Sequence, residues 1–322
     1  MSTSAITASK LTKSFKDNHV LKGIDLNIPT GSVFALLGPN GAGKTTIVRM
    51  LSTLLQIDGG EAHVGGFNVK TQADEVRGII GLTGQFAAVD DKLTGLENLQ
   101  IIGRLYHISA KDANRRAKEL IERFELTDAA KRAAKTYSGG MRRRLDLAAS
   151  LIITPPIIFL DEPTTGLDPN SRNAVWAMIE ELVKEGTTIL LTTQYLEEAD
   201  KLANKIAVID HGQVIAEGTA TELKAKVGHE HLELTLANTA AFEQATTLFS
   251  NLSVTSKASD LTMSIALDQG VHQLRSLLDQ LDDQKIAIDN FGIHRPTLDD
   301  VFLKLTGHQA EEVQPEVKGK KK

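Results

Sequence analysis

The feature that most constrains this chain is a glycine-rich segment between a short apolar run and a helical pattern. Residues Gly38-Pro39-Asn40-Gly41-Ala42-Gly43-Lys44-Thr45 match the pattern G-x-x-x-x-G-K-[ST]. The apolar run Val33–Leu37 before it indicates a buried strand, and apolar residues recur at helical spacing over residues 45–55. The order strand, loop, helix favours an α/β fold in which the loop surrounds phosphate groups. A purely structural strand–helix turn is the alternative.

Each residue type in this loop suits the binding of a nucleoside triphosphate. The loop must point its backbone N–H groups inward, a conformation that glycine adopts most easily, and the following helix directs its positive end to the same charge. The Lys44 ammonium is placed between the β- and γ-phosphates, and the Thr45 hydroxyl is placed to hold Mg²⁺. The predicted cofactors are therefore ATP and Mg²⁺. The predicted nucleotide-binding residues here are Gly38, Pro39, Asn40, Gly41, Ala42, Gly43, Lys44, Thr45 and Thr46.

A second apolar run, residues 157–160, is typical of a strand buried on both faces of a parallel sheet, and two acids follow it. Asp161, at the carboxyl end of this strand, is suited to bind Mg²⁺ directly or through water. Glu162 is suited to polarise the attacking water as a general base. Two acids at the start of a helix are the alternative, but the phosphate loop upstream favours the catalytic interpretation.

Strands alternate with helices along the first two-thirds of the chain, which indicates an α/β domain with a largely parallel sheet. The pattern is mostly helical between residues 86 and 150. Composition shifts near Gly228, and the order βαββαβ plus a closing helix then predicts a small ferredoxin-like α+β domain. We therefore expect three parts: a nucleotide-binding domain over residues 1–227, an accessory domain over 228–307 and a disordered tail over 308–322.

The sequence pattern gives residue ranges for the expected strands and helices. Strands are expected at residues 33–37, 79–82, 157–160, 188–191, 206–209, 231–236, 253–256, 261–265 and 285–289. Helices are expected at residues 45–55, 111–126, 141–153, 171–184, 240–248, 271–281 and 298–305.

Composition disfavours several other classes of protein. The 322 residues carry 36 basic and 41 acidic side chains, a formal net charge of −5, which does not indicate nucleic-acid binding. The chain contains no cysteine, which excludes disulfides and cysteine metal sites. No run approaches the roughly 20 apolar residues of a membrane span, and residues 1–10 do not resemble a signal peptide. We therefore expect any membrane part to come from another chain.

With these motifs the chain resembles the ATP-binding cassette (ABC) ATPases over about residues 6–218. Tyr137-Ser138-Gly139-Gly140-Met141 resembles the signature motif, with Met141 where the family usually has Gln, and Gly166-Leu167-Asp168 resembles the D-loop. The resemblance implies two cassettes placed head to tail, so that each ATP lies between one phosphate loop and the partner's signature. A plain N-cap, with Ser138 opening a helix, is the alternative interpretation of the signature.

The resemblance also implies roles for single residues. Phe15 resembles the aromatic residue that stacks on adenine, with Val20 beside it, although a core-facing strand residue is the alternative. Gln85 resembles the Q-loop glutamine, which senses the γ-phosphate and joins Thr45 and Asp161 as a metal ligand. Gln194 stands where the family carries a switch histidine, and an amide can donate hydrogen bonds but cannot take a proton as imidazole does. The expected catalytic residues are Glu162, Gln194, Gln85 and Lys44, and Asp168 joins Ser138, Gly139 and Gly140 in the nucleotide-binding set.

Arg142, Arg143 and Arg144 follow the signature directly. On a helix three consecutive side chains spread over a wide arc, so we interpret them mainly as a solvated face, with a contribution at the dimer interface as the alternative.

Two further segments narrow the resemblance. Residues 192–200 and 294–302 are similar to the daunorubicin-resistance type of drug-exporter ATPase. That resemblance implies an extra C-terminal domain and a homodimer at the cytoplasmic face of the membrane, energising a separate permease for hydrophobic drugs. The acidic charge balance disfavours a nucleic-acid partner. The surface at about residues 86–98 is expected to contact the permease.

Three other functions compete with drug export. They are export of lipid, polysaccharide or another cargo, a soluble ABC ATPase without a transporter, and a P-loop kinase. The single phosphate loop and the lack of a heptad stretch disfavour the second, and the signature and D-loop have no role in a kinase.

Overall fold

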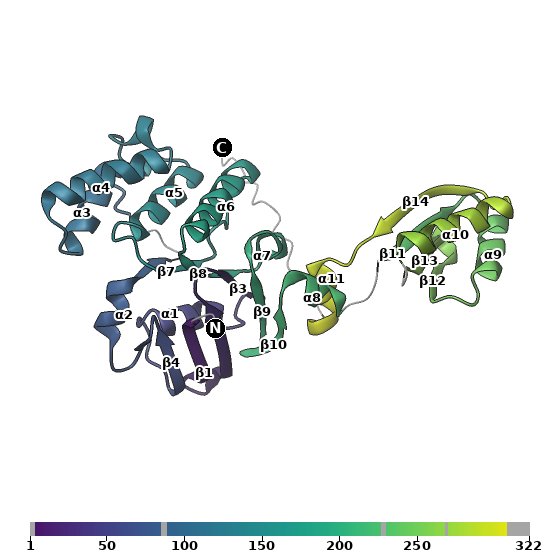
Figure 1. Cartoon of the computed structure of the whole chain (residues 1–322), viewed down its shortest axis with the longest axis horizontal. Coiled ribbons are helices and arrows are strands. Elements are labelled where there is room, and N and C mark those ends of the chain that lie inside the picture. Colours follow the sequence, from purple (N-terminus) through teal and green to yellow (C-terminus); the bar gives the residue numbers. More distant parts are fainter. Residues whose placement is uncertain (1–3, 85–88, 227–229, 268–269, 308–322) are drawn as a thin grey trace, which may run out of the picture. The chain divides into compact units, whose positions relative to one another are not determined.

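The computed structural model describes residues 4–84, 89–226, 230–267 and 270–307 (Figure 1). Contacts divide this part of the chain into two compact units, one ending at Ala220 and the other spanning Thr221–Gly307. No described helix is both long and apolar enough to cross a bilayer.

The first unit is built around a six-stranded sheet in the order β10-β9-β3-β8-β7-β6. All its strand pairs are parallel except that of β10 with β9. Every residue of β3, β7 and β8 is buried, which explains why these strands read as continuous apolar runs. The strands are β3 (Val33–Leu37), β6 (Ile80–Thr83), β7 (Ile157–Asp161), β8 (Thr188–Thr193), β9 (Lys205–Asp210) and β10 (Gln213–Gly218).

Helix α1 (Lys44–Leu51) lies between this sheet and a second, antiparallel sheet in the order β2-β1-β4-β5 (Figure 1). One hydrophobic core joins both sheets to the helix through residues such as Leu11, Phe34 and Ile47. The strands of the second sheet are β1 (Ser4–Phe15), β2 (Asn18–Pro29), β4 (Gly59–Val64) and β5 (Phe67–Asn68). The expected helix over residues 45–55 is therefore too long, because Ser52 caps α1 and Thr53 turns into the left-handed region at φ 65°.

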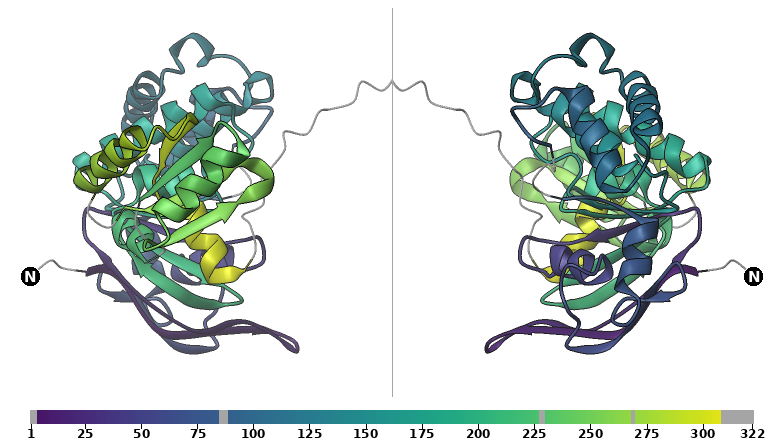
Figure 2. Two further views of the ribbon diagram at one scale, coloured as in Figure 1. Left: turned by 90° about the vertical axis from the view of Figure 1, so that its right-hand side faces the viewer. Right: turned by 90° about the vertical axis from the view of Figure 1, so that its left-hand side faces the viewer.

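The expected helical region is confirmed for its described residues. It contains α3 (Gly95–Leu105), α4 (Ala110–Arg123) and α5 (Gly139–Ser150), and it lies at the end of the first unit opposite the antiparallel sheet (Figure 2). Thr94 and Glu97 form a capping box that starts α3. The remaining helices of this unit are α2 (Ala73–Ile79), α6 (Pro169–Lys184) and α7 (Leu196–Leu202).

The second unit has the predicted βαββαβ order, with an antiparallel sheet in the order β12-β13-β11-β14. Helices α9 and α10 bury one face of it, including Leu232, Leu234 and Ile265. The elements are β11 (His231–Leu236), α9 (Thr239–Leu248), β12 (Val254–Lys257), β13 (Thr262–Ala266), α10 (Val271–Asp283) and β14 (Ile288–His294). Strand β14 begins three residues later than expected because Lys285 turns at φ 53° after α10.

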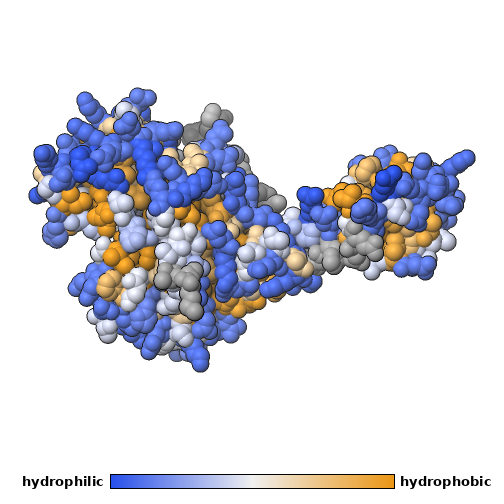
Figure 3. Space-filling model, in the orientation of Figure 1, coloured by the Kyte–Doolittle hydropathy of each residue, from blue (hydrophilic) through white to orange (hydrophobic). Residues whose placement is uncertain are grey.

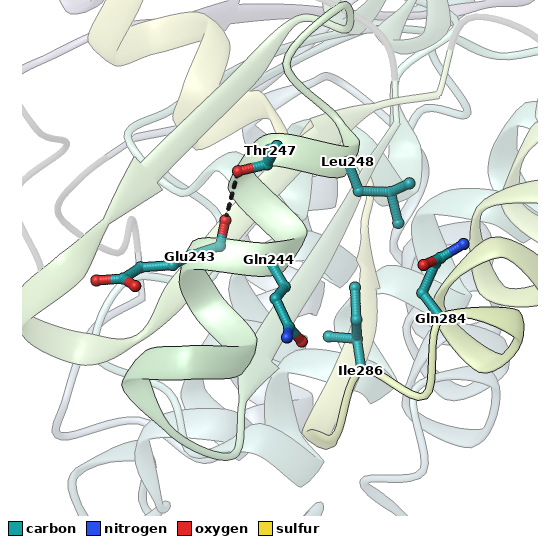
Figure 4. Close-up of a pocket in the computed structure, with 6 residues that line it drawn as sticks. All are labelled: Glu243, Gln244, Thr247, Leu248, Gln284 and Ile286. Carbon is teal, nitrogen blue, oxygen red and sulfur yellow. Dashed lines mark hydrogen bonds between the residues drawn. The ribbon is translucent and has the colours of Figure 1, made fainter.

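Two short helices and a surface hollow complete the second unit. Helices α8 (Ala220–Ala225) and α11 (Leu298–Thr306) are tied by Lys304 Nζ, which donates to Lys226 O over 3.1 Å. Figure 4 shows a hollow between α9 and the segment after α10, with the buried Ile286 among its lining residues and exposed side chains such as Glu243 and Gln284 at its rim.

Candidate nucleotide-hydrolysis site

The glycine-rich loop joins β3 to α1 at the carboxyl edge of the parallel sheet. Strand β9 passes so close that a Cβ on Gly38 would lie 2.2 Å from Ile209 O. Gly41 and Gly43 have φ angles of 83° and 107°, in the region where a side chain is strained. These glycines are therefore required by the shape of the loop, which excludes an ordinary turn of mixed sequence.

Lys44 lies over this loop. Its Nζ donates to Gly38 O over 2.7 Å and to Pro39 O over 3.0 Å, and it lies 4.0 Å from Glu162 Oε1. Burial lowers the pKa of Lys44, and the carboxylates of Glu162 and Asp161 oppose that shift. The Lys44 amine therefore lies beside two acids and over the backbone of the loop.

Asp161 and Thr45 meet at the ends of β7 and α1. Asp161 Oδ1 accepts from Thr45 Oγ1 over 3.2 Å and from Thr192 Oγ1 over 2.5 Å. Among the described residues no cluster of three or more acids and histidines could hold a metal by itself. One hydroxyl and one carboxylate nevertheless fit Mg²⁺, which usually binds one or two carboxylates and completes its shell with phosphates and water.

Glu162 adopts a strained backbone beside this pair. Its φ is 49°, uncommon for a residue with a side chain, and its N–H donates to both Thr192 O and Thr192 Oγ1 over 3.1 Å. Its side chain is 7% exposed. Such strain is found at functional sites, where the surroundings hold the residue in place.

The signature residues start α5, and the D-loop precedes α6. Ser138 Oγ accepts from Met141 N over 3.2 Å as an N-cap, and Ser138 and Gly139 are exposed. Asp168 caps α6 by accepting from Ser171 N over 3.0 Å and from Ser171 Oγ over 2.6 Å, and these hydrogen bonds lower the pKa of Asp168. The two segments lie together: Gly139, Glu162, Gly166 and Leu167 line one hollow of about 570 Å³.

The remaining predicted residues are less closely grouped. Phe15 is 48% exposed with the Lys13 ammonium 5.6 Å from its ring centre, so the core-facing alternative is wrong. Val20 is half-buried against the core. Gln194 follows β8, and its Oε1 is buried with no hydrogen-bond partner within the described part of the chain. Gln85 lies outside the described residues.

The interpretation of the three arginines as a solvated face is wrong for Arg143, whose side chain is 13% exposed and donates to backbone carbonyls of the predicted catalytic segments. Arg142 pairs with Asp91, and Arg144 donates to Phe124 O over 3.2 Å. A wide arc on a helix includes its buried side, and Arg143 falls there.

Sequence reasoning also missed Thr192 and Glu198. Glu198 is fully buried, its Oε1 accepts from Thr164 Oγ1 over 2.8 Å and from Trp176 Nε1 over 3.1 Å, and burial raises its pKa. The available signal was its helical spacing, which places it on the same face as Ala199 and Leu202.

A lysine and a hydroxyl follow buried strand β3, and two acids stand at the end of β7, which is separated from β3 by β8 alone. Together they define a P-loop nucleoside triphosphatase. The solved structures place the first unit among cassettes of this class. One is an ATP-binding cassette whose dimeric structure holds ADP and phosphate in a post-hydrolysis state. It is 26% identical, with a TM-score of 0.61 over 66% of this chain and 98% of that chain.

The sequence comparisons cover both units. The family described as "ABC transporter" matches residues 21–165, and the family described as "ATP-binding protein DrrA1-3-like, C-terminal domain" matches residues 218–306. The chain is 49% identical over 313 residues to daunorubicin resistance ATP-binding protein DrrA2 of Streptomyces coeruleorubidus, covering 96% of this chain and 97% of that protein. It is 51% identical to daunorubicin/doxorubicin resistance ATP-binding protein DrrA of Streptomyces peucetius, with coverages of 96% and 94%. The chain therefore belongs to the ABC transporter family of ATP-binding proteins, which hydrolyse ATP to drive transport.

Proposed function

We propose that this chain powers the export of daunorubicin-type drugs through a separate membrane permease, as a homodimer on the cytoplasmic face of the membrane. The observation that carries the hydrolytic part is the pair Asp161 and Glu162, which faces Lys44 and Thr45 across the phosphate loop. The drug assignment is supported by two relatives about half identical to this chain, whose names state resistance to daunorubicin and whose likeness includes the second unit.

In the proposed hydrolysis each described residue has one task. Thr45 and Asp161 would hold Mg²⁺, which would stabilise the charge that develops on the phosphates. Lys44 shifts from the loop carbonyls to the β- and γ-phosphates. Glu162 accepts the hydrogen bond of the attacking water and orients it. The Gln194 amide forms a hydrogen bond with this water or with the γ-phosphate. The resemblance to the Q-loop glutamine assigns Gln85 two tasks, which are to sense the γ-phosphate and to act as a further metal ligand.

The proposed dimer follows from the exposed start of α5. The N-terminus of this 12-residue helix leaves backbone N–H groups free to bind an anion. Ser138 and Gly139 are exposed there, with Gly140 behind them. In a head-to-tail pair this end closes over the nucleotide held by the partner's Gly38–Thr46 segment, with Phe15 and Val20 beside the adenine and Asp168 at the interface.

The proposed permease contact is the region after the Q-loop. Helix α3 leaves Ile101, Leu105 and the adjoining Tyr106 exposed, by 45%, 72% and 43%. Figure 3 shows apolar surface over this part of the first unit. Apolar patches of this kind mark protein interfaces, so we extend the expected contact at residues 86–98 to the end of α3.

Two substitutions test the hydrolytic dimer. Glu162→Gln keeps the size of the side chain but removes the base, so ATP binding stays intact while turnover falls by about 10²–10⁴-fold and an ATP-bound dimer accumulates. Ser138→Arg blocks the helix end that faces the partner's nucleotide. ATP hydrolysis therefore stops at both sites of the homodimer, while a monomer still binds ATP. Full turnover of Glu162→Gln, or normal activity of Ser138→Arg, refutes the respective role.

Reconstitution tests the transport assignment. The chain is co-expressed and co-purified with a candidate permease and placed in lipid vesicles, and ATP hydrolysis is measured with and without daunorubicin. Stimulation that disappears in Glu162→Gln, together with ATP-dependent daunorubicin accumulation in inverted vesicles, supports drug export. An intact complex that hydrolyses ATP but neither responds to daunorubicin nor moves it refutes the drug assignment and leaves the ATPase assignment standing.

A further inference from the structure

The guanidinium of Arg143 reaches three backbone carbonyls that belong to two different catalytic segments. Its Nε donates to Pro163 O over 2.7 Å and its Nη2 donates to Asp161 O over 3.1 Å, so Arg143 binds the backbone of the residues before and after Glu162. Its Nη1 donates to Gly84 O over 3.0 Å, at the residue directly before Gln85. One side chain therefore joins helix α5 to the two segments that carry the predicted base and the predicted γ-phosphate sensor.

The carbonyls on either side of Glu162 matter because Glu162 itself is strained. A residue with a side chain holds φ 49° only if its surroundings over-determine that conformation. Thr192 fixes the N–H of Glu162 through two contacts of 3.1 Å. Arg143 binds the carbonyls of the preceding residue, Asp161, and of the following residue, Pro163. Thr192 and Arg143 together therefore hold the peptide unit before the strained Cα, and Arg143 also holds the unit that follows Pro163.

The charges around Arg143 explain why the side chain stays in this position. Its side chain is 13% exposed, and Asp146 Oδ2, on the next turn of α5, accepts from Nη1 over 3.3 Å. Burial lowers the pKa of Arg143, while the carboxylates of Asp146, Glu198, Asp161 and Glu162 oppose that shift. A planar guanidinium presents several donors at fixed angles, which the single ammonium of lysine cannot reproduce at three carbonyls.

We propose that Arg143 is a positioning residue for ATP hydrolysis: it holds Glu162 in its strained, water-orienting conformation and ties that conformation to the helix that begins at Ser138. This inference rests on the proposed role of Glu162 as the general base. It adds that α5, through Arg143, links the partner-facing signature of a protomer to the base of the same protomer. Movement of α5 when the signature engages the partner's nucleotide is thereby passed to Glu162.

The test is a double-substitution cycle with Arg143→Gln and Glu162→Gln, followed by single-turnover phosphate release at saturating ATP. In the otherwise unchanged protein Arg143→Gln lowers the single-turnover rate constant by about 100-fold, the loss typical of a catalytic group displaced by about 1 Å, while the Kd for ATP changes by less than about twofold. In the Glu162→Gln protein the same substitution lowers this rate constant by less than about threefold, because the carboxylate that Arg143 positions is already absent. Arg143→Lys keeps the charge but has fewer matched donors, so its rate constant lies between those of the unchanged protein and Arg143→Gln.

Arg144→Gln is the matched control, since Arg144 lies on the same helix and donates to Phe124 O and Glu125 within the helical region. We expect its turnover to remain within about twofold of the unchanged protein. Equal losses from Arg143→Gln in both backgrounds, or an equal loss from Arg144→Gln, overturn the proposal. Full turnover of Glu162→Gln alone overturns the proposed base instead. If Arg143→Gln does not fold, as judged by its far-UV spectrum, Arg143→Lys is measured in both backgrounds and is judged by the same criterion.

Discussion

Replacing Thr192 by Val isolates the hydrogen bond that supports the predicted metal ligand. Thr192 is fully buried, and its hydroxyl donates to Asp161 Oδ1 over 2.5 Å and accepts from Glu162 N over 3.1 Å. Valine has the same shape but no hydroxyl. Glu162 N keeps its other acceptor, Thr192 O at 3.1 Å, so the main loss is one hydrogen bond to a carboxylate.

The size of two effects follows from that contact. A hydrogen bond to a charged group contributes about 1.5–3 kcal/mol, so we expect the free energy of unfolding to fall by about 2 kcal/mol. Groups that orient a metal ligand typically affect metal affinity or activity by about 10–100-fold. We therefore expect the Mg²⁺ concentration for half-maximal ATP hydrolysis to rise by about 10-fold or more in Thr192→Val.

Thr188→Val separates these effects. Thr188 is also fully buried on β8, but its hydroxyl accepts from Gly31 N over 2.9 Å, away from the acids. Urea denaturation and Mg²⁺ titration of ATP hydrolysis are measured for both variants. Both should be destabilised, but the Mg²⁺ dependence should change only in Thr192→Val. The same Mg²⁺ dependence in both variants refutes the reasoning that Thr192 orients a metal ligand.

Two further predictions concern packing and pH. Gly140→Ala would place a Cβ 2.3 Å from Ser171 Oγ and 2.7 Å from Ser171 Cβ, so we expect a loss of about 1–3 kcal/mol in urea denaturation. Adding Ser171→Gly should recover at least half of this loss, and equal losses in both backgrounds contradict the steric cause. Burial raises the pKa of Glu198 above its usual 4.5, so the folded state binds this proton more tightly than the unfolded state. The associated stability is present below pH 4.5 and is lost as the pH rises through the folded-state pKa, so Glu198→Gln should gain stability relative to the unchanged protein over that range. A stability difference that does not vary with pH in urea denaturation contradicts this prediction.

Local features of the site could be predicted from the sequence because they depend on neighbouring residues. The loop at residues 38–45 has the left-handed turns at Gly41 and Gly43 that its glycines indicate, and strand β3 has the bounds that its apolar run indicates. Strand β11 and the βαββαβ order of the second unit are likewise confirmed. Each single element here is marked by a pattern that is complete within a short stretch of the chain.

The antiparallel sheet of the first unit could not be predicted in this way. Strands β1 and β2 each span 12 residues, but their pairing shifts between Ala8 and Leu11, where Lys10 has φ 47°. Such a bulge interrupts the alternation of apolar and polar residues that indicates a strand. Contacts between distant segments were also hidden, since Arg143 and Thr192 act on residues 18 and 31 positions away.

The conformation of Glu162 explains how two consecutive acids can both face the glycine-rich loop and its following helix. In a regular strand the side chains of adjacent residues point to opposite faces of the sheet, so Asp161 and Glu162 would be separated. Asp161, paired with Thr192 in the register of β7 and β8, keeps the regular direction and meets Thr45. Glu162 departs from it at φ 49°, and its carboxylate lies 4.0 Å from Lys44 Nζ. Backbone strain at one residue thus brings the predicted base to the same side as the predicted metal ligand, which is why the contacts of Thr192 and Arg143 around that residue bear on catalysis.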